Sequence, residues 1–163
     1  MSGAEIELAS TVGRETILRE RLEGLEGEYD YIFIDCPPAL GLLTLNALTS
    51  ATEVFIPVQT EFFALEGIGK LLQTIEAVKK RLNRDLEITG IIPVMFDVRT
   101  NLSQQVLDKI VGYFGDKVFK AKIRVNIRLA EAPSFGKPII TYAPSSHGAE
   151  DYLALAREVI SYE

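Results

Sequence analysis

Short apolar runs alternate along this chain with segments whose apolar residues have helical spacing, and few folds accommodate that alternation. The runs Tyr31–Ile34, Val54–Val58 and Ile88–Met95 are typical of strands that are buried on both faces. A shorter fourth run covers Pro138–Thr141. Strands that alternate with helices favour a mostly parallel α/β sheet with helices on both faces. We therefore predict a single α/β domain over residues 1–163.

Four segments carry apolar side chains at the three- and four-residue steps of a helix. They predict helices within residues 17–25, 68–82, 102–114 and 152–160. Asn101 precedes the third segment and Gln104 lies three residues further on, which resembles a capping box. Because ligands bind beyond the carboxyl ends of strands in such sheets, a functional site is expected at that edge.

Composition and charge exclude several classes of protein. With 17 Lys and Arg against 23 Asp and Glu, the net charge of −6 argues against a protein that coats nucleic acid with its whole surface, although not against a local basic patch. The single cysteine, Cys36, excludes a disulfide framework and fits a reducing cytoplasm. The first twenty residues contain no apolar run, and the apolar stretch at Ile88–Phe96 is far shorter than the ~18 residues of a membrane span. We expect a cytoplasmic protein without a membrane segment.

Asp35 follows the apolar run Tyr31–Ile34 and stands where the predicted strand ends. Nucleotide-binding proteins place a carboxylate there to hold Mg²⁺, directly or through a water. An aspartate after a buried strand is also common as a plain turn or cap residue. The companion phosphate loop, G-x-x-x-x-G-K-[ST], is absent from these 163 residues, because Gly69-Lys70 and Gly136-Lys137 lack its first glycine and its final hydroxyl.

Cys36 is a second candidate for chemistry, as a thiol nucleophile at a strand end. The single histidine, His147, is far away in the sequence, and no motif joins the two residues. A buried, inert thiol and a loop histidine are the more common interpretations of such residues. A thiol-dependent α/β enzyme is therefore one alternative.

The segment Lys117–Ala130 is the sharpest charge feature of the sequence. It holds five basic residues and no acidic one: Lys117, Lys120, Lys122, Arg124 and Arg128. Asp116 and Glu131 bound it on either side. A charge run of this kind is commonly a solvated face. The functional interpretation is a patch that contacts the phosphates of DNA or of a nucleotide.

Several linked motifs resemble one family. The stretch from Tyr29 to Leu48, which includes Asp35-Cys36-Pro37-Pro38, resembles the switch II (Walker B) segment of the ParA/Soj chromosome-partitioning ATPases. Further matches follow in the same order: Ile56-Pro57-Val58-Gln59, Ala64-Leu65-Glu66-Gly67, Asp97 with Arg99-Thr100-Asn101-Leu102, Glu131-Ala132-Pro133-Ser134 and Gly136-Lys137-Pro138-Ile139. The resemblance runs from about Gly3 to the C-terminus and identifies the chain as a member of the family.

The resemblance implies an activity and the residues that serve it. ParA/Soj proteins are deviant Walker-type P-loop ATPases that form a homodimer with ATP and Mg²⁺, bind DNA as dimers without sequence preference, and are stimulated by a ParB-type protein. By resemblance, Asp35 holds Mg²⁺ through water, and the switch that responds to the γ-phosphate is formed by Cys36, Pro37 and Pro38. The arginines implied to face DNA are Arg99 and Arg128. This match favours the functional interpretation of the basic segment, which adds Lys120 and Lys122 as DNA-facing candidates. The residues implied to border the adenine are Val94, Met95, Asp97 and Arg124. The implied location is the cytoplasm, at the nucleoid, with no membrane contact.

This sequence departs from the family pattern at three places. The family's N-terminal third carries the P-loop, its signature lysine and the switch I aspartate, and the resemblance here begins after them, as in a truncated gene or an excised fragment. Arg124-Val125-Asn126 stands where relatives usually read Pro-Arg-Asn, and His147 stands where an arginine is frequent. We expect a part of a partitioning ATPase that by itself holds no ATP or Mg²⁺ firmly and hydrolyses no ATP. The alternative is a non-enzymatic module that binds DNA, a ParB-type protein or a full-length relative.

The missing strand raises the question of how the sheet closes. In P-loop proteins of this type, the strand that leads into the phosphate loop lies between the Walker B strand and the following one, here residues 31–35 and 54–58. Each buried backbone group without a partner costs ~1–3 kcal/mol. We predict that residues 31–35 and 54–58 pair directly. A strand from Glu5–Leu8, or one from a second copy of the chain, is the alternative.

Overall fold

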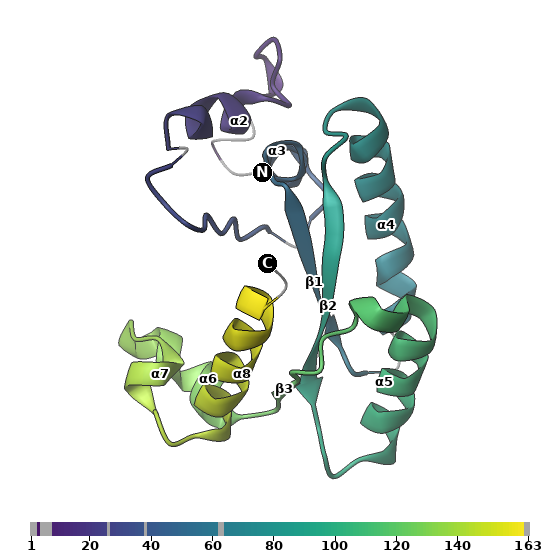
Figure 1. Cartoon of the computed structure of the whole chain (residues 1–163), viewed down its shortest axis with the longest axis vertical. Coiled ribbons are helices and arrows are strands. Elements are labelled where there is room, and N and C mark those ends of the chain that lie inside the picture. The colour runs from purple at the N-terminus through teal and green to yellow at the C-terminus, as the bar shows by residue number, and fades with distance from the viewer. Residues whose placement is uncertain (1–2, 4–7, 26, 38, 62–63, 162–163) are drawn as a thin grey trace. The chain divides into compact units, whose positions relative to one another are not determined.

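The contacts within the chain group its residues into two compact units. The structure, drawn in Figure 1, is a computed structural model that describes residues 3, 8–25, 27–37, 39–61 and 64–161. The first unit comprises residues 1–54 and 68–88, and the second comprises residues 55–67 and 89–163. That residues 1–163 act as a single domain stays a prediction.

The sheet has three strands in the order β1-β2-β3, formed by Glu53–Gln59, Glu87–Phe96 and Ile123–Arg124. β2 and β3 run parallel. Between β1 and β2, the N–H of Glu87 donates to the carbonyl of Thr52 and the N–H of Thr60 donates to that of Val94. The residue numbers of the two strands therefore rise together, as in a parallel pair. The strands predicted at 54–58 and 88–95 are confirmed.

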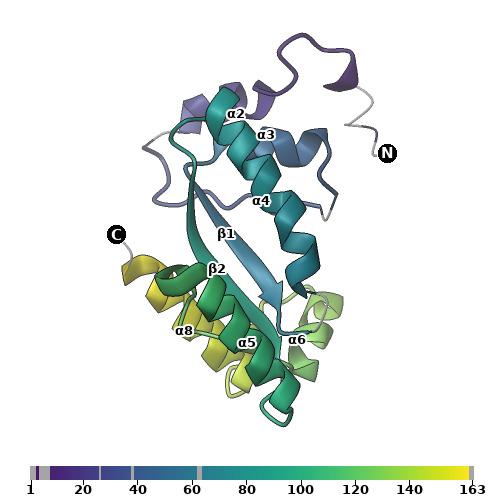
Figure 2. The same ribbon diagram turned by 90° about the vertical axis from the view of Figure 1, so that its right-hand side faces the viewer.

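Helices lie on both faces of the sheet in the second unit. α5 (Asn101–Phe114) and α8 (His147–Ser161) lie on opposite faces, as the two perpendicular views show (Figure 1, Figure 2). Shorter elements complete the unit: the 3-10 helix η2 (Gly115–Lys117), α6 (Ile127–Glu131), the 3-10 helix η3 (Ala132–Phe135) and α7 (Ile139–Tyr142). The predicted α/β fold and the helices predicted at 102–114 and 152–160 are confirmed. In the described part of the chain, no helix is both long and apolar enough to cross a lipid bilayer.

Phe119 is fully buried in the second unit and packs against β2. Its ring stacks on that of Phe55, with centroids 5.7 Å apart. A Cβ on Gly90 would lie 2.6 Å from the Phe119 ring, so glycine is needed for this close approach of ring and strand. The other buried apolar side chains of the strands and of α5 in this unit are Ile56, Val58, Ile91, Pro93, Phe96, Val106, Leu107, Ile110 and Ile123.

Polar side chains connect the helices of the first unit. These helices are α2 (Ile17–Leu22), the 3-10 helix η1 (Glu23–Leu25), α3 (Leu42–Ser50) and most of α4 (Ala64–Arg81). The buried Asn46 side chain of α3 accepts the N–H of Leu18 at 3.1 Å. Arg19 donates to the carbonyl of Thr49 at 3.0 Å and to that of Leu82 at 3.1 Å. The helices predicted at 17–25 and 68–82 are confirmed.

Residues 31–37 belong to no strand. Tyr31, Ile32 and Phe33 are 40%, 46% and 76% exposed, and the rings of Tyr31 and Phe33 stack with centroids 6.0 Å apart. The strand predicted at Tyr31–Ile34 is therefore wrong, and so is its direct pairing with residues 54–58. An apolar run becomes a strand only when a neighbouring strand supplies hydrogen bonds, and the run itself does not encode that neighbour. Most of the alternative segment Glu5–Leu8 lies outside the described residues.

Residues 138–141, predicted as a fourth strand, form α7 instead. The N–H groups of Tyr142 and Ala143 donate to the carbonyls of Pro138 and Ile139, which closes one helical turn. Ile139 is buried in a small apolar cluster with Ala132 and Ala149. Four residues are too few for periodicity to separate a strand from one turn of helix.

The capping box predicted at the start of α5 is also wrong by one residue. Thr100, not Asn101, is the N-cap, and its side chain accepts the N–H of Ser103 at 3.3 Å. Gln104 donates to Asp108 one turn further along the helix, at 2.7 Å. A threonine and an asparagine are both good caps, so the residue types alone do not decide which one begins the helix.

Candidate functional site

The predicted switch residues lie in the first unit and are open to solvent. Asp35, Cys36 and Pro37 are exposed, and the Cys36 thiol approaches the carbonyl of Ile34 at 3.9 Å. Desolvation, and then the neighbouring Asp35 carboxylate, raise the pKa of the Cys36 thiol. Because a thiolate is the reactive form, this environment does not favour the thiol-enzyme alternative. Pro38 lies outside the described residues.

A magnesium ion at this segment would meet one carboxylate. The described residues contain no group of three or more His, Cys, Asp or Glu side chains that could hold a metal ion. Mg²⁺ in nucleotide sites keeps several waters and takes one or two carboxylates together with substrate phosphates. The contact of Asp35 with Mg²⁺ through a water therefore stays a prediction, and a bound nucleotide would have to supply the remaining negative ligands.

The predicted base-side residues Val94, Met95 and Asp97 lie at the carboxyl end of β2. A bulge interrupts the pairing with β3 between residues 94 and 96, and Met95 within it has a φ of 54°, in the left-handed region. This conformation is uncommon for a residue with a side chain and is often found at functional sites. The Thr60 hydroxyl donates to the Met95 carbonyl at 3.2 Å. Arg124 ends the paired strand β3. All four residues predicted to border the adenine therefore lie at the carboxyl ends of the two neighbouring strands.

Acidic residues of α8 engage the Arg124 side chain. Its Nε donates to Asp151 at 3.0 Å, and its Nη2 donates to Asp151 at 2.6 Å and to Glu150 at 3.3 Å. The Asp151 side chain is 8% exposed and that of Arg124 is 32% exposed. The hydrogen bonds to Asp151 raise the pKa of Arg124. Arg124 thus fastens β3 to α8, and its place beside an adenine stays a prediction.

Arg99 follows β2 and is paired with Asp97. Its Nε and Nη2 donate to the two carboxylate oxygens at 2.9 and 2.7 Å, and its backbone N–H donates to the same side chain at 3.0 Å. The Arg99 side chain is 79% exposed, whereas that of Asp97 is 22% exposed. The hydrogen bonds from Arg99 lower the pKa of Asp97 to about 2.

Arg128 on α6 is paired in the same manner with Glu131, three residues later. The Arg128 Nη1 donates to Glu131 at 2.8 Å, and the Tyr142 hydroxyl donates to the same carboxylate oxygen at 3.0 Å. The bonds from Arg128 and then from Tyr142 lower the pKa of Glu131. The Asn126 side chain caps α6 by accepting the N–H of Arg128 at 2.9 Å. Both arginines implied to face DNA are therefore already partnered by carboxylates.

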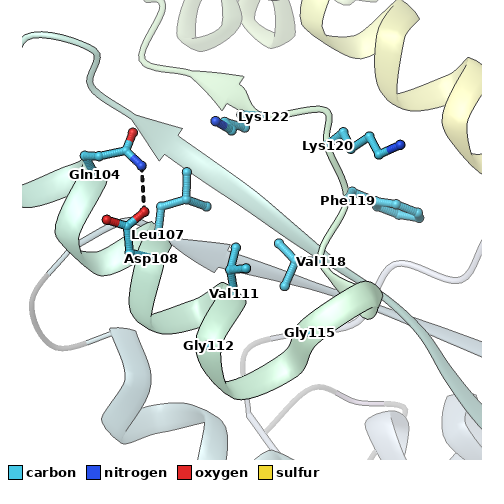
Figure 3. A pocket seen from close by; sticks show the side chains of 10 residues that line it. All are labelled: Gln104, Leu107, Asp108, Val111, Gly112, Gly115, Val118, Phe119, Lys120 and Lys122. Carbon is cyan, nitrogen blue, oxygen red and sulfur yellow. Dashed lines mark hydrogen bonds between the residues drawn. The ribbon is translucent and has the colours of Figure 1, made fainter.

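The two lysines predicted to face DNA lie on the segment between η2 and β3. Glu158 of α8 fixes this segment, because its two oxygens accept the N–H groups of Lys120 and Ala121, each at 2.8 Å. The ammonium of Lys122 lies 5.1 Å from the centroid of the Phe96 ring. In Figure 3 the side chains of Lys120 and Lys122 point away from each other.

A pocket of about 650 Å³ lies between α5, η2 and this segment (Figure 3). Apolar side chains such as Leu107, Val111 and Val118 line it, and Lys122 and Asp108 supply charges of opposite sign. The pocket is a different place from the edge of the sheet at which the predicted base-side residues lie, since it shares none of them.

The carboxylates that partner the basic residues were not predicted from the sequence. These are Glu131, Glu150, Asp151 and Glu158. For Arg128 and Glu131 a signal was present, because residues three apart on a helix are neighbours. For Asp151 and Glu158 the spacing of seven indicates only a shared helix face, and the strand or loop that this face meets is not visible in the sequence.

Comparisons with known proteins agree on one family. A family model described as "AAA domain" matches residues 1–88. The chain is 57% identical, over 98% of its length, to the sporulation initiation inhibitor protein Soj of Bacillus subtilis, and 53% identical over 98% to the chromosome partitioning protein ParA of Myxococcus xanthus. It covers 63% and 56% of the length of those two relatives.

A solved structure supports the fold. The structure of cobyrinic acid a,c-diamide synthase from Mycobacterium smegmatis matches 92% of this chain and 54% of that protein with a TM-score of 0.75 and 36% identity. The same enzyme has been solved with a bound ATP analogue and magnesium.

The parallel sheet with helices on both faces, together with these similarities, defines a protein of the P-loop NTPase-like α/β class. Within this class, the chain belongs to the ParA/Soj family of chromosome-partitioning ATPases. It spans less than two thirds of the length of the curated relatives described above.

Proposed function

We propose that this chain is the part of a ParA-type partitioning ATPase that follows the phosphate loop, and that its second unit binds DNA without sequence preference. The segment Lys117–Ala130 carries the proposal, because it holds five basic residues and no acidic one in a chain with a net charge of −6. Non-specific binding depends on lysine and arginine contacts to phosphates, which need no base recognition.

The packing of this segment supports the proposal. Glu158 and Asp151 of α8 accept backbone N–H groups of Lys120, Ala121 and Arg124, all within 2.9 Å. These bonds anchor the backbone and leave the lysine side chains for other contacts. Neither Lys120 nor Lys122 makes an ion pair with a carboxylate among the described residues.

The whole protein would use this surface in a nucleotide-dependent cycle. By family membership, ATP and Mg²⁺ would drive formation of a homodimer, two basic surfaces would then meet one DNA duplex, and a ParB-type protein would stimulate hydrolysis. Asp35 would contact Mg²⁺ through water, and Cys36, Pro37 and Pro38 would follow the γ-phosphate. The protein would then reside in the cytoplasm, at the nucleoid. This chain alone would bind DNA weakly, because one surface makes half of the phosphate contacts.

Substitution of the two arginines tests the proposal. In the full-length protein, Arg99→Glu and Arg128→Glu should abolish binding of unrelated duplexes in a gel shift, while wild-type binding should fall steeply as salt rises. Circular dichroism should show that both variants remain folded, since both side chains are exposed. An unchanged gel shift for both variants would mean that the basic segment is an ordinary solvated face and does not bind DNA.

A second candidate function is a non-enzymatic module that binds a protein partner. The exposed apolar segment with Tyr31, Ile32 and Phe33 favours it, since exposed apolar patches commonly mark protein contacts. Phe33→Ser should then weaken capture of the relevant ParB-type protein and leave DNA binding unchanged. Loss of DNA binding in this variant would argue against a separate protein-binding role.

A further inference from the structure

The basic residues implied to face DNA divide into two groups by their neighbours. Arg99 and Arg128 are each bonded to a carboxylate within three residues, at 2.7 Å to Asp97 and at 2.8 Å to Glu131. Lys120 and Lys122 have no such partner among the described residues. The same arrangement therefore occurs at two separate places, after β2 and on α6.

Each carboxylate accepts a second hydrogen bond, so that neither is held by the guanidinium alone. The Asp97 side chain also accepts the backbone N–H of Arg99 at 3.0 Å. Glu131 also accepts the hydroxyl of Tyr142, whose ring stacks on Phe135 with centroids 5.0 Å apart. Both carboxyl groups are ionised at neutral pH, and the hydrogen bonds from the arginines lower the pKa of each further. Both arginines consequently meet solvent with a fixed negative charge beside them.

We propose that Asp97 and Glu131 are positioning residues that hold Arg99 and Arg128 in internal ion pairs and thereby weaken the binding of DNA. The proposal rests on the proposed DNA-binding function. A phosphate that approaches either guanidinium must share its N–H donors with the carboxylate or displace it. The two carboxylates thus act as built-in competitors of the DNA backbone and keep its affinity low.

Salt dependence distinguishes this role from a merely structural one. DNA binding becomes salt-dependent because basic side chains replace condensed cations, with a slope of about −0.9 for each phosphate neutralised. An arginine whose charge is already balanced by a carboxylate neutralises less of a phosphate and releases fewer cations. Freeing the arginine should therefore both raise the affinity and steepen the slope.

The experiment compares Asp97→Asn and Glu131→Gln with the wild-type chain of 163 residues. Both replacements remove the charge and keep an oxygen that can accept the Arg99 N–H or the Tyr142 hydroxyl. The dissociation constant of a short fluorescent duplex is measured by anisotropy over a series of KCl concentrations that begins well below physiological ionic strength. Each variant should bind about threefold more tightly, within the range measured for exposed ion pairs. The slope of log K against log salt should steepen by up to about 0.9.

Asp85→Asn is the matched control for net charge. Asp85 is exposed and makes no ion pair among the described residues, so its replacement changes the net charge equally and frees no arginine. The double variant Asp97→Asn/Arg99→Ala completes the test. Its affinity should differ from that of Arg99→Ala by no more than Asp85→Asn differs from wild type, because the carboxylate acts through Arg99.

The outcomes separate the inference from the function on which it rests. If Arg99→Ala and Arg128→Ala leave DNA binding unchanged, the proposed function fails and the inference fails with it. If these variants weaken binding but Asp97→Asn and Glu131→Gln behave like Asp85→Asn, the function stands and the inference is overturned. Weaker binding by Asp97→Asn would also overturn it, since the carboxylate would then orient Arg99 toward DNA.

Discussion

The Asp151 carboxylate on α8 accepts three N–H groups from one residue, Arg124 on β3. The Nη2, the backbone N–H and the Nε of Arg124 lie 2.6, 2.9 and 3.0 Å from it. A strand of only two residues, Ile123–Arg124, is thereby joined to a helix of 15. Since Ile123 and Arg124 lie within the basic segment Lys117–Ala130, the pair also fastens the middle of that segment to α8.

Removal of Arg124 should destabilise the chain. In Arg124→Ala, Asp151 keeps a buried charge and loses its side-chain donors, which should lower the free energy of unfolding by about 1–3 kcal/mol. The measurement is urea denaturation followed by circular dichroism. Arg157→Ala is the control, because Arg157 is exposed on the same helix. Equal midpoints for the two variants would show that the Arg124–Asp151 pair does not stabilise the fold.

Gly90 should tolerate no side chain. In Gly90→Ala the new Cβ would lie 2.6 Å from the Phe119 ring, and the resulting overpacking should cost about 1–3 kcal/mol. The double variant Gly90→Ala/Phe119→Leu should recover part of the loss. Gly112→Ala is the matched control, since nothing lies within 4 Å of a Cβ there and alanine favours a helix. Thermal melting of the three variants checks the order; a Gly90→Ala melting temperature equal to that of wild type would contradict it.

Cys36 should react slowly with alkylating reagents. Its pKa is raised by desolvation and then by the charge of Asp35, so less thiolate is present at neutral pH than in an ordinary peptide thiol. Asp35→Asn removes one of the two causes and should speed alkylation by iodoacetamide, whereas Asp30→Asn should not. Mass spectrometry over a range of pH gives the rates. A wild-type rate above that of a model peptide thiol would revive the thiol-enzyme alternative.

The Asp97 carboxyl group should titrate far below its usual range. The Arg99 hydrogen bonds lower its pKa from 3.8 to about 2, so the stabilisation from this pair is complete above pH 3.8 and is lost as the pH falls toward 2. In Arg99→Ala the pKa should return toward 3.8. Carboxyl carbon chemical shifts measured against pH by NMR give both values. Identical titration curves in the two proteins would mean that the pair does not form in solution.

The chain alone should show no ATP hydrolysis and at most weak ATP binding. The reason is that its 163 residues hold no phosphate-loop motif, and Asp35 offers one water-mediated metal contact. Calorimetry with Mg-ATP measures this directly, and Mg-ADP serves as the comparison. A dissociation constant in the micromolar range would reveal a phosphate cradle built from other residues.

Local sequence signals predicted the elements whose formation depends on one segment at a time. The helices α4, α5 and α8 follow from apolar spacing, since a helix satisfies its backbone hydrogen bonds within itself. β1 and β2 were also predicted, from their apolar runs, although each needs a neighbouring strand for its hydrogen bonds. The family motifs also singled out Asp35, Arg99 and Arg128 as candidate site residues. They could do so because the order of motifs along a chain is visible in the sequence.

The tertiary structure decided the interactions between residues that are distant in the sequence. The run Tyr31–Ile34 has the composition of a buried strand, yet it belongs to no strand, because a strand needs a second segment to complete its hydrogen bonds. Ile139 and its neighbours became helical where they could bury Ile139 against Ala132 and Ala149. The pairing of Arg124 with Asp151, 27 residues apart, likewise depends on α8 packing beside β3. The amino-acid sequence by itself therefore determined the helices with clear apolar spacing, the two long strands and the family. Which strands pair, and which carboxylate lies beside Arg124, was decided only by the tertiary structure, because folding brings groups that are distant in the sequence within hydrogen-bonding distance.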